Sequence, residues 1–281
     1  MTVHVLTLTC ADRPGIVASI AEGLFELGGN ILENAQYGDE VTDTFCIRTR
    51  FEADIDDPAT VADALADRAA ALDAELRVRR EADPMRTVVM VSRHDHCLLD
   101  LLYRLRIGEL PIDLRAVVSN HPDLGELVRA EGHRFEHVPV TEGTKADAEA
   151  RLVEILDEQD VELVVLARYM QILSDELCER LAGRCINIHH SFLPGFKGAR
   201  PYHQAWEHGV KLIGATAHYV TAGLDDGPII DQGVERVTHH ATVDDFVAVG
   251  RDTERLVLSR AVRAHAEHRV FLIGERTVVF P

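Results

Sequence analysis

The stretch VELVVLA at residues 161–167 decides the fold of most of this chain. It is a nearly continuous run of Val and Leu, and similar apolar runs occur at TVVMVS (87–92), DLRAVVSN (113–120), FEHVPV (135–140) and RCINI (184–188). Sequence typical of helices separates these runs near residues 97–107, 122–131, 144–158 and 174–182. Strands that are apolar on both faces and are joined by helices form parallel sheets covered on both sides. The pattern therefore predicts an α/β domain with a mostly parallel sheet.

This sheet is expected to continue in an antiparallel direction. The segments IGATAHYV (213–220) and GPIIDQGVERV (227–237) are close enough in sequence to pair with each other. A long amphipathic helix follows, with a capping box formed by Thr242 and Asp245 at its start. Its apolar positions include Val243, Phe246, Val249 and Leu256.

The first eighty or so residues follow a different pattern. Residues 3–9 alternate as in a strand, and a helix follows with Ile16, Ile20, Leu24 and Leu27 on one face. Asp12 is placed to cap this helix, Pro14 suits its first turn, and Gly28-Gly29 ends it. Further strand and helix patterns predict a ferredoxin-like βαββαβ order. The break at residues 81–84 predicts two domains, residues 1–83 and 84–281.

Composition limits the possible functions. The chain has 281 residues, 46% of them hydrophobic, and a formal net charge of −18. This charge argues against a nucleic-acid partner, because such proteins need a cationic surface. There is no apolar run of membrane-spanning length and no signal-peptide pattern at the start, so a cytoplasmic location is expected. The five cysteines lack a C-x-x-C pair and are expected to be reduced core residues.

Candidate site residues follow the predicted strands. In open parallel sheets, ligands bind beyond the carboxyl ends of the strands. This rule directs attention to residues 92–97, 120–121, 168–172 and 187–200. The first of these reads SRHDHC and lacks the G-x-G-x-x-G pattern, which argues against a nucleotide cofactor.

The stretch NIHHSFLPGFKGARPYHQA at residues 187–205 is rich in polar groups. Asn187 and His189 end a strand and should project to the same side, whereas His190 should face away from His189. Because no carboxylate or Cys stands nearby at ligand spacing, a metal site is disfavoured. A carboxamide beside an imidazole can hold a carbonyl oxygen that gains negative charge. A histidine that only bonds the backbone is an equally good interpretation of these three residues alone.

A second polar stretch is AHYVTAGLDDGPII at residues 217–230. His218 falls within a predicted strand, and residues 225–228 form a tight turn. An Asp before Gly-Pro is common in turns without any further role. The functional alternative is that Asp225 or Asp226 orients a water molecule or an imidazole.

These stretches carry a resemblance to known families. The two polar stretches, together with VVLARYMQILS (164–174) and VGRDTERLVLSRAVRAH (249–265), resemble the formyltransferase-fold enzymes that use 10-formyltetrahydrofolate. The segment LTLTCADRPGIVASIAEGLFELGGNI (6–31) is similar to the ACT regulatory domain. The combination, with His190 where glycinamide ribonucleotide transformylases usually have proline, resembles the formyltetrahydrofolate deformylase family over essentially the whole chain. The resemblance implies an N-terminal ferredoxin-like ACT domain followed by a Rossmann-like formyltransferase domain.

The resemblance also implies residue roles. Asn187, His189 and Asp225 match the catalytic residues of the family, with a folate as the substrate and no tightly bound cofactor or metal. Residues 192–200 would be the loop that walls the site. The residues implied to bind the substrate are Arg168, Tyr169, Met170, Gln171, Ile172, Leu173, His218 and Asp226.

For the N-terminal part, the resemblance implies a sensor of small amino acids that also pairs subunits into a homo-oligomer. The expected effectors are glycine and methionine. A domain kept only for dimerisation is the alternative. The residues implied to bind the effector are Asp12, Arg13, Gly15, Asn30 and Ile31.

Two other functions stay open at this stage. One is a glycinamide ribonucleotide formyltransferase with a fused regulatory domain, although SRHDHC lacks the glycines that hold the acceptor phosphate in those enzymes. The other is a non-catalytic sensor of folate and amino acids. The presence of Asn187, His189 and Asp225 favours an enzyme.

Overall fold

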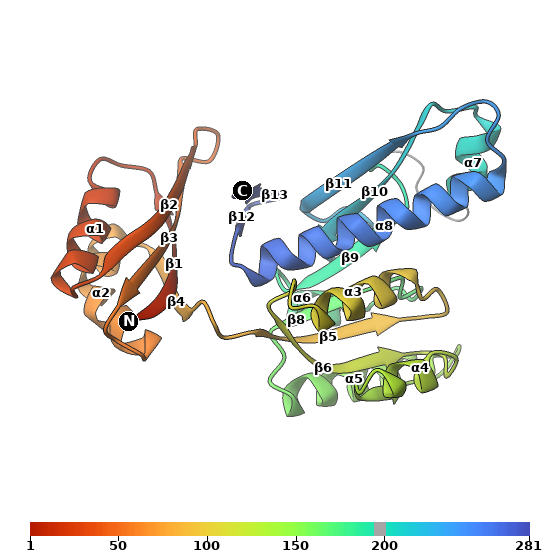
Figure 1. Ribbon diagram of the computed structural model, residues 1–281, viewed down its shortest axis with the longest axis horizontal. Helices are drawn as coiled ribbons and strands as arrows, with labels where there is room; N and C mark the ends of the chain where they lie inside the picture. Colours follow the sequence, from red (N-terminus) through yellow and green to blue (C-terminus); the bar gives the residue numbers. More distant parts are fainter. Residues whose placement is uncertain (194–200) are drawn as a thin grey trace. The chain divides into compact units, whose positions relative to one another are not determined.

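The computed structural model describes residues 1–193 and 201–281, and the chain divides into two compact units. The first unit contains residues 1–84 and 267–281, and the second contains residues 85–266. Residues 267–281, which the sequence predicts to belong to the second domain, belong instead to the first unit. Figure 1 labels the elements of both units.

The first unit has the βαββαβ order that the sequence predicts. Its elements are β1 (Thr2–Ala11), α1 (Ile16–Glu26), β2 (Asn30–Asp39), β3 (Thr44–Ala53), α2 (Pro58–Leu72) and β4 (Glu75–Arg80). The strands form an antiparallel sheet in the order β2-β3-β1-β4. Apolar side chains of α1 and α2, including Ile20 and Leu65, pack with Leu6 and Phe51 of the sheet. This packing forms the core of the unit.

The start of α1 differs from the expectation. The helix begins at Ile16, its N-cap is Gly15 with a φ of 97°, and no side chain caps it. Asp12 is therefore not the cap, and Pro14 precedes the helix. A left-handed conformation is available to glycine without steric cost, so Gly15 can make the sharp turn that leads into the helix.

The C-terminal hairpin completes the first unit. Strands β12 (Val270–Ile273) and β13 (Arg276–Val279) pair with each other. Phe271, Ile273 and Phe280 form a buried cluster with Cys46 of β3. An ion pair of 2.6 Å between Arg276 and Asp39 ties the hairpin to the end of β2. The apolar cluster explains why this segment groups with the first unit.

The second unit contains a seven-stranded sheet. Its strands are β5 (Met85–Val91), β6 (Ile112–Ser119), β7 (Phe135–His137), β8 (Leu163–Leu166), β9 (Cys185–His189), β10 (Leu212–Tyr219) and β11 (Ile229–Arg236). Its helices are α3 (His96–Arg106), α4 (Gly125–Ala130), α5 (Lys145–Glu158), α6 (Asp175–Arg180), α7 (Pro201–Glu207) and α8 (Val243–Ala266).

The strand order explains where a ligand can bind. The order is β11-β10-β9-β8-β5-β6-β7, with β5 to β9 parallel and β10 and β11 antiparallel to their neighbours. The chain runs outward from β5 to β7 and then returns to place β8 on the other side of β5. Crevices form at such a reversal, beyond the carboxyl ends of the strands.

The long helix α8 begins with the predicted capping box. Thr242 Oγ1 accepts a hydrogen bond from the Asp245 backbone N–H at 3.2 Å, and the Asp245 carboxylate accepts one from the Thr242 N–H at 2.8 Å. Phe246 is buried as expected, whereas Leu256 is 38% exposed. Among the described residues, no helix has the length and apolar character needed to cross a membrane. All five cysteines are free and buried.

Candidate active site

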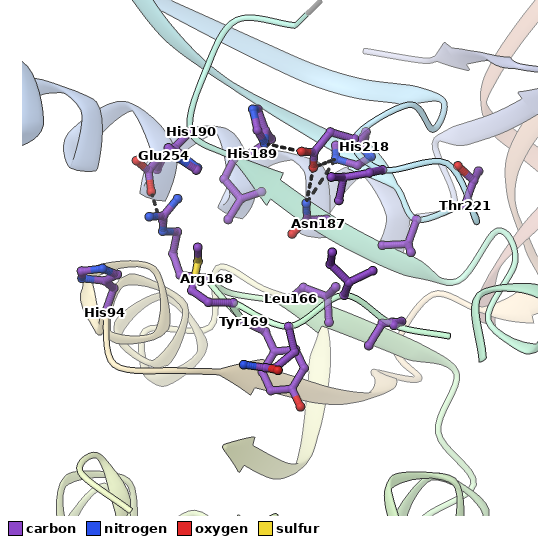
Figure 2. A pocket seen from close by; sticks show the side chains of 18 of the residues that line it. His94, Leu166, Arg168, Tyr169, Asn187, His189, His190, His218, Thr221 and Glu254 are labelled. Carbon is purple, nitrogen blue, oxygen red and sulfur yellow. Dashed lines mark hydrogen bonds and ion pairs between the residues drawn. The ribbon is translucent and has the colours of Figure 1, made fainter. Parts of the chain in front are cut away.

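A cavity of about 570 Å³ lies within the second unit. It opens beyond the carboxyl ends of β5, β8 and β9, as the strand order predicts. The residues that follow β8 and β10 form the apolar part of the cavity wall, and imidazole and charged side chains form the polar part. Figure 2 shows part of its lining. The polar and aromatic side chains at the wall are His94, His96, Arg168, Tyr169, Gln171, Asn187, His189, His190, Tyr202, His203, His218, Thr221, Asp225, Arg251 and Glu254.

Two neighbouring strands place the central residues. β9 and β10 pair so that His218 lies opposite Asn187, and Thr216 lies opposite His189. Asn187 and His189 project to the same side because residues two apart on a strand share a face. This part of the sequence prediction is confirmed by the contacts that both residues make with Asp225.

Asp225 lies in the turn between β10 and β11 and reaches both strand-end residues. Its Oδ2 atom lies 3.1 Å from His189 Nδ1, and its Oδ1 atom lies 3.5 Å from Asn187 Nδ2. The Oδ1 atom is also 3.7 Å from His218 Nε2. The turn is tight, because a Cβ atom on Gly227 would come within 1.8 Å of the Tyr219 carbonyl oxygen. The carboxylate is thus held at the centre of a cluster of an amide and two imidazoles.

The hydrogen bonds indicate which atoms carry protons. His218 Nδ1 lies 2.9 Å from the Tyr219 carbonyl oxygen, so this nitrogen donates and Nε2 is left to accept. The Asn187 Nδ2 atom, 3.2 Å from His218 Nε2, faces both this acceptor and the Asp225 carboxylate. The amide nitrogen of Asn187, and not its oxygen, must therefore point toward them.

His189 has one partnered and one unpartnered nitrogen. Its Nδ1 atom donates to Asp225, whereas Nε2 is buried and has no hydrogen-bond partner among the described residues. A buried polar atom without a partner is rare in folded proteins. An oxygen atom of a bound ligand can supply the missing contact.

The charge of Asp225 is stabilised by its surroundings. Burial favours the neutral acid, but the hydrogen bond from His189, the contact with His218 and the positive charge of either ring when it is protonated outweigh burial and hold the pKa of Asp225 well below its usual range. The carboxylate is therefore ionised at neutral pH. Its backbone φ of 51° lies in the left-handed region, which aspartate tolerates better than most residues other than glycine.

A second cluster of charges lies at the other end of the cavity. Glu254 of α8 is 1% exposed, and its Oε1 atom accepts a hydrogen bond of 2.6 Å from Tyr202. Its Oε2 atom faces His96 Nε2 at 2.9 Å and Arg168 Nε at 3.3 Å. In Figure 2, Arg168, Glu254, His190 and His94 lie together, away from His218 and Thr221. The cavity therefore has two polar centres.

The ionisation state of Glu254 follows from these contacts. Burial acts to raise its pKa, but the hydrogen bond from His96, the charge of Arg168 and the hydrogen bond from Tyr202 lower the pKa to about 2. Among the described residues, His96, Cys97 and Glu254 bring possible metal-ligand atoms within 4.8 Å of one another. The permanent cation of Arg168 on the same carboxylate oxygen disfavours a second cation there.

The predicted substrate-binding residues are only partly at the cavity. Residues 168–173 and His218 all line it, and the loop is fixed because Met170 N–H donates to Ser92 Oγ at 2.9 Å. Asp226, also predicted, is exposed and is not part of the cavity wall, because the turn directs Asp225 inward in its place. Residues 120–121 do not line the cavity, but Asn120 accepts a hydrogen bond of 2.7 Å from Ser92, which in turn bonds Met170 N–H.

The orientation predicted for His190 is wrong. The ring centroids of His189 and His190 lie 4.9 Å apart, and both rings line the cavity. β9 ends at His189, so the alternation of strand side chains does not apply to the next residue. Burial, together with the charges of Arg168 and His189, lowers the pKa of His190 to about 3. The prediction for the loop 192–200 falls mainly on residues 194–200, which lie outside the described residues.

Sequence reasoning did not find the residues that α7 and α8 contribute. Tyr202, Arg251 and Glu254 line the cavity from these helices. One signal was available for Glu254, because it shares a helix face with the buried residues Gly250, Val257 and Leu258. A carboxylate on an apolar helix face needs a buried partner.

The predicted effector residues lie in the first unit. Asp12, Arg13 and Gly15 precede α1, and Asn30 and Ile31 begin β2. Arg13 donates a 3.0 Å hydrogen bond to the Ala71 carbonyl, and Asn30 donates one of 3.0 Å to Glu52. The strand register places the two groups at opposite ends of the sheet, because Asn30 pairs with Glu52 at the end of β3, whereas Ala11, next to Asp12, pairs with Thr44 at its start. The five residues therefore do not form one site within a single unit, and an amino-acid site that uses them remains a prediction.

Comparison with known proteins gives the class to which this fold and site belong. The Formyl transferase family matches residues 85–262, which cover the whole cavity wall. The chain therefore belongs to the formyl transferase family.

The full-length relatives are more specific. A formyltetrahydrofolate deformylase from Corynebacterium sp. (strain P-1) is 49% identical over 98% of this chain and 97% of its own. The crystal structure of a formyltetrahydrofolate deformylase from Burkholderia mallei has a TM-score of 0.96 and 46% identity, with both chains covered completely. A glycinamide ribonucleotide transformylase from Symbiobacterium toebii has a TM-score of 0.68 and 33% identity over 72% of this chain and 97% of its own.

Proposed function

We propose that this protein hydrolyses 10-formyltetrahydrofolate to formate and tetrahydrofolate. The proposal rests on the polar cluster formed by Asn187, His189, His218 and Asp225, which lines a cavity large enough for a folate. It also rests on the similarity of the chain, over nearly its whole length, to formyltetrahydrofolate deformylases. The transformylase neighbour covers only part of the chain, which favours hydrolysis over transfer to a nucleotide.

The oxyanion is held by Asn187 and His189. When water attacks the formyl carbon, the carbonyl oxygen gains negative charge. One N–H of the Asn187 amide faces His218 Nε2, and the other, whose contact with Asp225 is long at 3.5 Å, can turn to the oxyanion. A protonated Nε2 of His189 can donate to it as well, and Asp225 stabilises the charged imidazole through Nδ1. Positioned donors of this kind can each lower the barrier of acyl transfer by about 3 kcal/mol.

Asp225 orients the attacking water. Its low pKa makes it a good hydrogen-bond acceptor but a poor store for a proton. His218 Nε2, 3.7 Å from Asp225 Oδ1, is the acceptor to which the proton can pass. The C–N10 bond then breaks, N10 takes one proton from His189, and the second proton of the water leaves to solvent as formate ionises. The proton held by His218 then passes to His189 by way of Asp225, which lies between the two rings, and the site returns to its starting state. The proposed steps use side chains of this chain only, with no tightly bound cofactor.

The apolar part of the cavity is proposed to hold the pterin. Met170, Ile172 and Leu173 form one wall, and Val220 and Leu224 form another. Met170 and Ile172 are more than half exposed in this structure, at 54% and 63%, so their apolar surface is available to a flat ring. Backbone groups of the loop 168–173 can supply hydrogen bonds to the ring edges.

The test follows formate and tetrahydrofolate after purified protein is mixed with 10-formyltetrahydrofolate, with and without glycinamide ribonucleotide. Formate release at the same rate in both mixtures is expected. If the nucleotide becomes formylated and formate release stops when the nucleotide is present, the protein is a transferase instead.

The first unit is proposed to be an ACT-type regulatory domain that binds glycine or methionine and joins subunits. Its βαββαβ order and its edge strand β2 support this role. Ile31, Leu32 and Tyr37 of this strand are 38%, 41% and 44% exposed, a large apolar surface for an edge strand. A formate-release assay with millimolar glycine or methionine tests the sensor, and light scattering tests the oligomer. Rates that do not respond to either amino acid would leave dimerisation as the role of the domain.

A further inference from the structure

Arg168 adopts a backbone conformation that is unfavourable for arginine. Its φ is 64°, in the left-handed region that favours glycine. The segment is fixed on both sides, because the Arg168 carbonyl accepts a hydrogen bond of 3.2 Å from Ser92 N–H and Met170 N–H donates to Ser92 Oγ. Strained residues persist at functional sites when the surrounding structure holds them. The strain makes Arg168 a candidate for a functional role.

The guanidinium of Arg168 is buried at the second polar centre. Its side chain is 10% exposed, and Nε lies 3.3 Å from Glu254 Oε2 without the geometry of a hydrogen bond. Both oxygens of Glu254 already have partners, since Tyr202 donates to Oε1 and His96 lies at Oε2. The carboxylate is therefore not free to receive another cation.

The remaining side chains at this end include uncharged imidazoles. Burial lowers the pKa of His190 to about 3, and burial and the charge of Arg168 lower the pKa of His94. Neutral imidazoles can hydrogen-bond a water molecule as donor or as acceptor. His190 adjoins His189, so a water held here is next to the proposed reaction centre.

An amine acceptor would meet an unfavourable environment at this place. A primary amine reaches the site mostly as an ammonium ion at neutral pH and must lose a proton before it attacks. A free carboxylate would assist both steps, but Glu254, at this end of the cavity, is neutralised by its partners, and Asp225 is engaged by His189 and Asn187. A guanidinium stays charged under all ordinary conditions, and because Glu254 divides its negative charge among Tyr202, His96 and Arg168, part of the positive field of Arg168 remains and disfavours an ammonium ion in a poorly solvated cavity. Water carries no charge and meets no such barrier.

We propose that Arg168, held by Glu254, sets the acceptor specificity of the site by excluding protonated primary amines and admitting water. The inference rests on the proposed hydrolysis. If the guanidinium is removed, an amine can take the place of water. A bond then forms between the amine nitrogen and the formyl carbon, the C–N10 bond breaks, and the amine proton passes to N10, which gives a formamide and tetrahydrofolate.

The experiment measures two products in one reaction. Wild-type protein and the variants Arg168→Asn and Arg168→Lys are mixed with 10-formyltetrahydrofolate and millimolar glycinamide, and formate and N-formylglycinamide are quantified by mass spectrometry. Asparagine tolerates a left-handed φ, so the first variant removes the charge without added strain. The control is Arg151→Gln, which removes an arginine that is paired on the surface of α5. Circular dichroism and a thermal melt check folding, and Arg168→Gly replaces the Asn variant if that one does not fold.

The expected result is a rise of about tenfold or more in the ratio of N-formylglycinamide to formate for Arg168→Asn, which is a common size for discrimination by a single contact. Arg168→Lys and Arg151→Gln should keep the wild-type ratio. An unchanged ratio in the Asn variant, or the loss of both products in a folded variant, would overturn the specificity role. A wild-type protein that releases no formate would instead contradict the proposed hydrolysis.

Discussion

His189 Nδ1 lies 3.1 Å from Asp225 Oδ2, and this contact joins the end of β9 to the turn after β10. The contact fixes which nitrogen of His189 carries the proton shared with the carboxylate. It also leaves Nε2 of the same ring without a partner among the described residues. The pair therefore works as one unit, in which Asp225 prepares His189 to donate to the reacting oxygen.

The variant Asp225→Asn should lower kcat by about 10²–10³, because an amide cannot stabilise the charged imidazole and places a donor toward it. The variant His189→Ala should lose turnover to a similar extent. In the double variant, the loss should be close to that of one single variant, since residues that act as a unit are not additive. Initial rates of formate release measure all three.

A matched control is Asp252→Asn, which changes an exposed carboxylate on α8 that pairs with Arg255. It should keep the wild-type rate. Thermal melts establish that each variant is folded. Losses that add fully in the double variant would show that Asp225 and His189 act independently.

Much of the second unit could be predicted from sequence for a simple physical reason. Buried parallel strands must be apolar on both faces, so their Val- and Leu-rich runs are visible without any knowledge of tertiary contacts. The same reasoning placed Asn187 and His189 on one side of a strand. It failed for His190, because the alternation of side chains ends where β9 ends.

Long-range contacts were not available from sequence. The role of Asp225 came from family resemblance, since DDGP is an ordinary turn sequence. Glu254 was missed because its partners Arg168 and His96 come from distant segments. The C-terminal hairpin was assigned to the wrong unit, because its Phe271 and Phe280 reveal no partner until they are seen against Cys46.

Removal of an aromatic ring from this hairpin should destabilise the first unit and leave the reaction centre intact. Phe280 is 7% exposed and packs edge to face against Phe271, with ring centroids 5.2 Å apart. Phe280→Ala should lower the free energy of unfolding by about 3–5 kcal/mol, the usual cost for a buried aromatic residue. Urea denaturation followed by circular dichroism measures the change.

The control for this variant is Val279→Ala, which shortens the side chain of the preceding residue, 38% exposed, at the end of β13. Its effect should be below about 1 kcal/mol. If Phe280→Ala proves as mild as Val279→Ala, the hairpin does not contribute to the core of the first unit.

Gly227 should be essential for the position of Asp225. An alanine Cβ at this residue would lie 1.8 Å from the Tyr219 carbonyl oxygen, so Gly227→Ala must move the turn that carries Asp225. We expect at least about a hundredfold loss of kcat, because displacement of a catalytic group by about 1 Å has this effect. Gly143→Ala is the control, since a Cβ atom there meets nothing within 4 Å. A Gly227→Ala protein with the wild-type rate would show that the turn is not needed to place the carboxylate.

The stability of the first unit should depend on pH through His268. Burial and the nearby charges of Arg79 and Arg48 lower the pKa of His268 to about 4. The unfolded chain, with an ordinary histidine pKa of about 6.5, binds a proton more readily than the folded protein, so stability falls as the pH drops below that value. Between about pH 7 and pH 5, this histidine alone should cost about 2 kcal/mol.

The variant that tests this effect is His268→Asn, because His268 has a φ of 55° and asparagine tolerates that conformation. Between about pH 7 and pH 5, the free energy of unfolding of the variant should fall by about 2 kcal/mol less than that of the wild type. Urea denaturation at both pH values measures the difference. His137→Asn, which changes an exposed histidine at the end of β7, should keep the wild-type dependence. The sign of the effect decides between two states of His268. If the wild-type protein became more stable than His268→Asn as the pH falls, His268 would be protonated in the folded state, and its arginine neighbours would not keep it neutral.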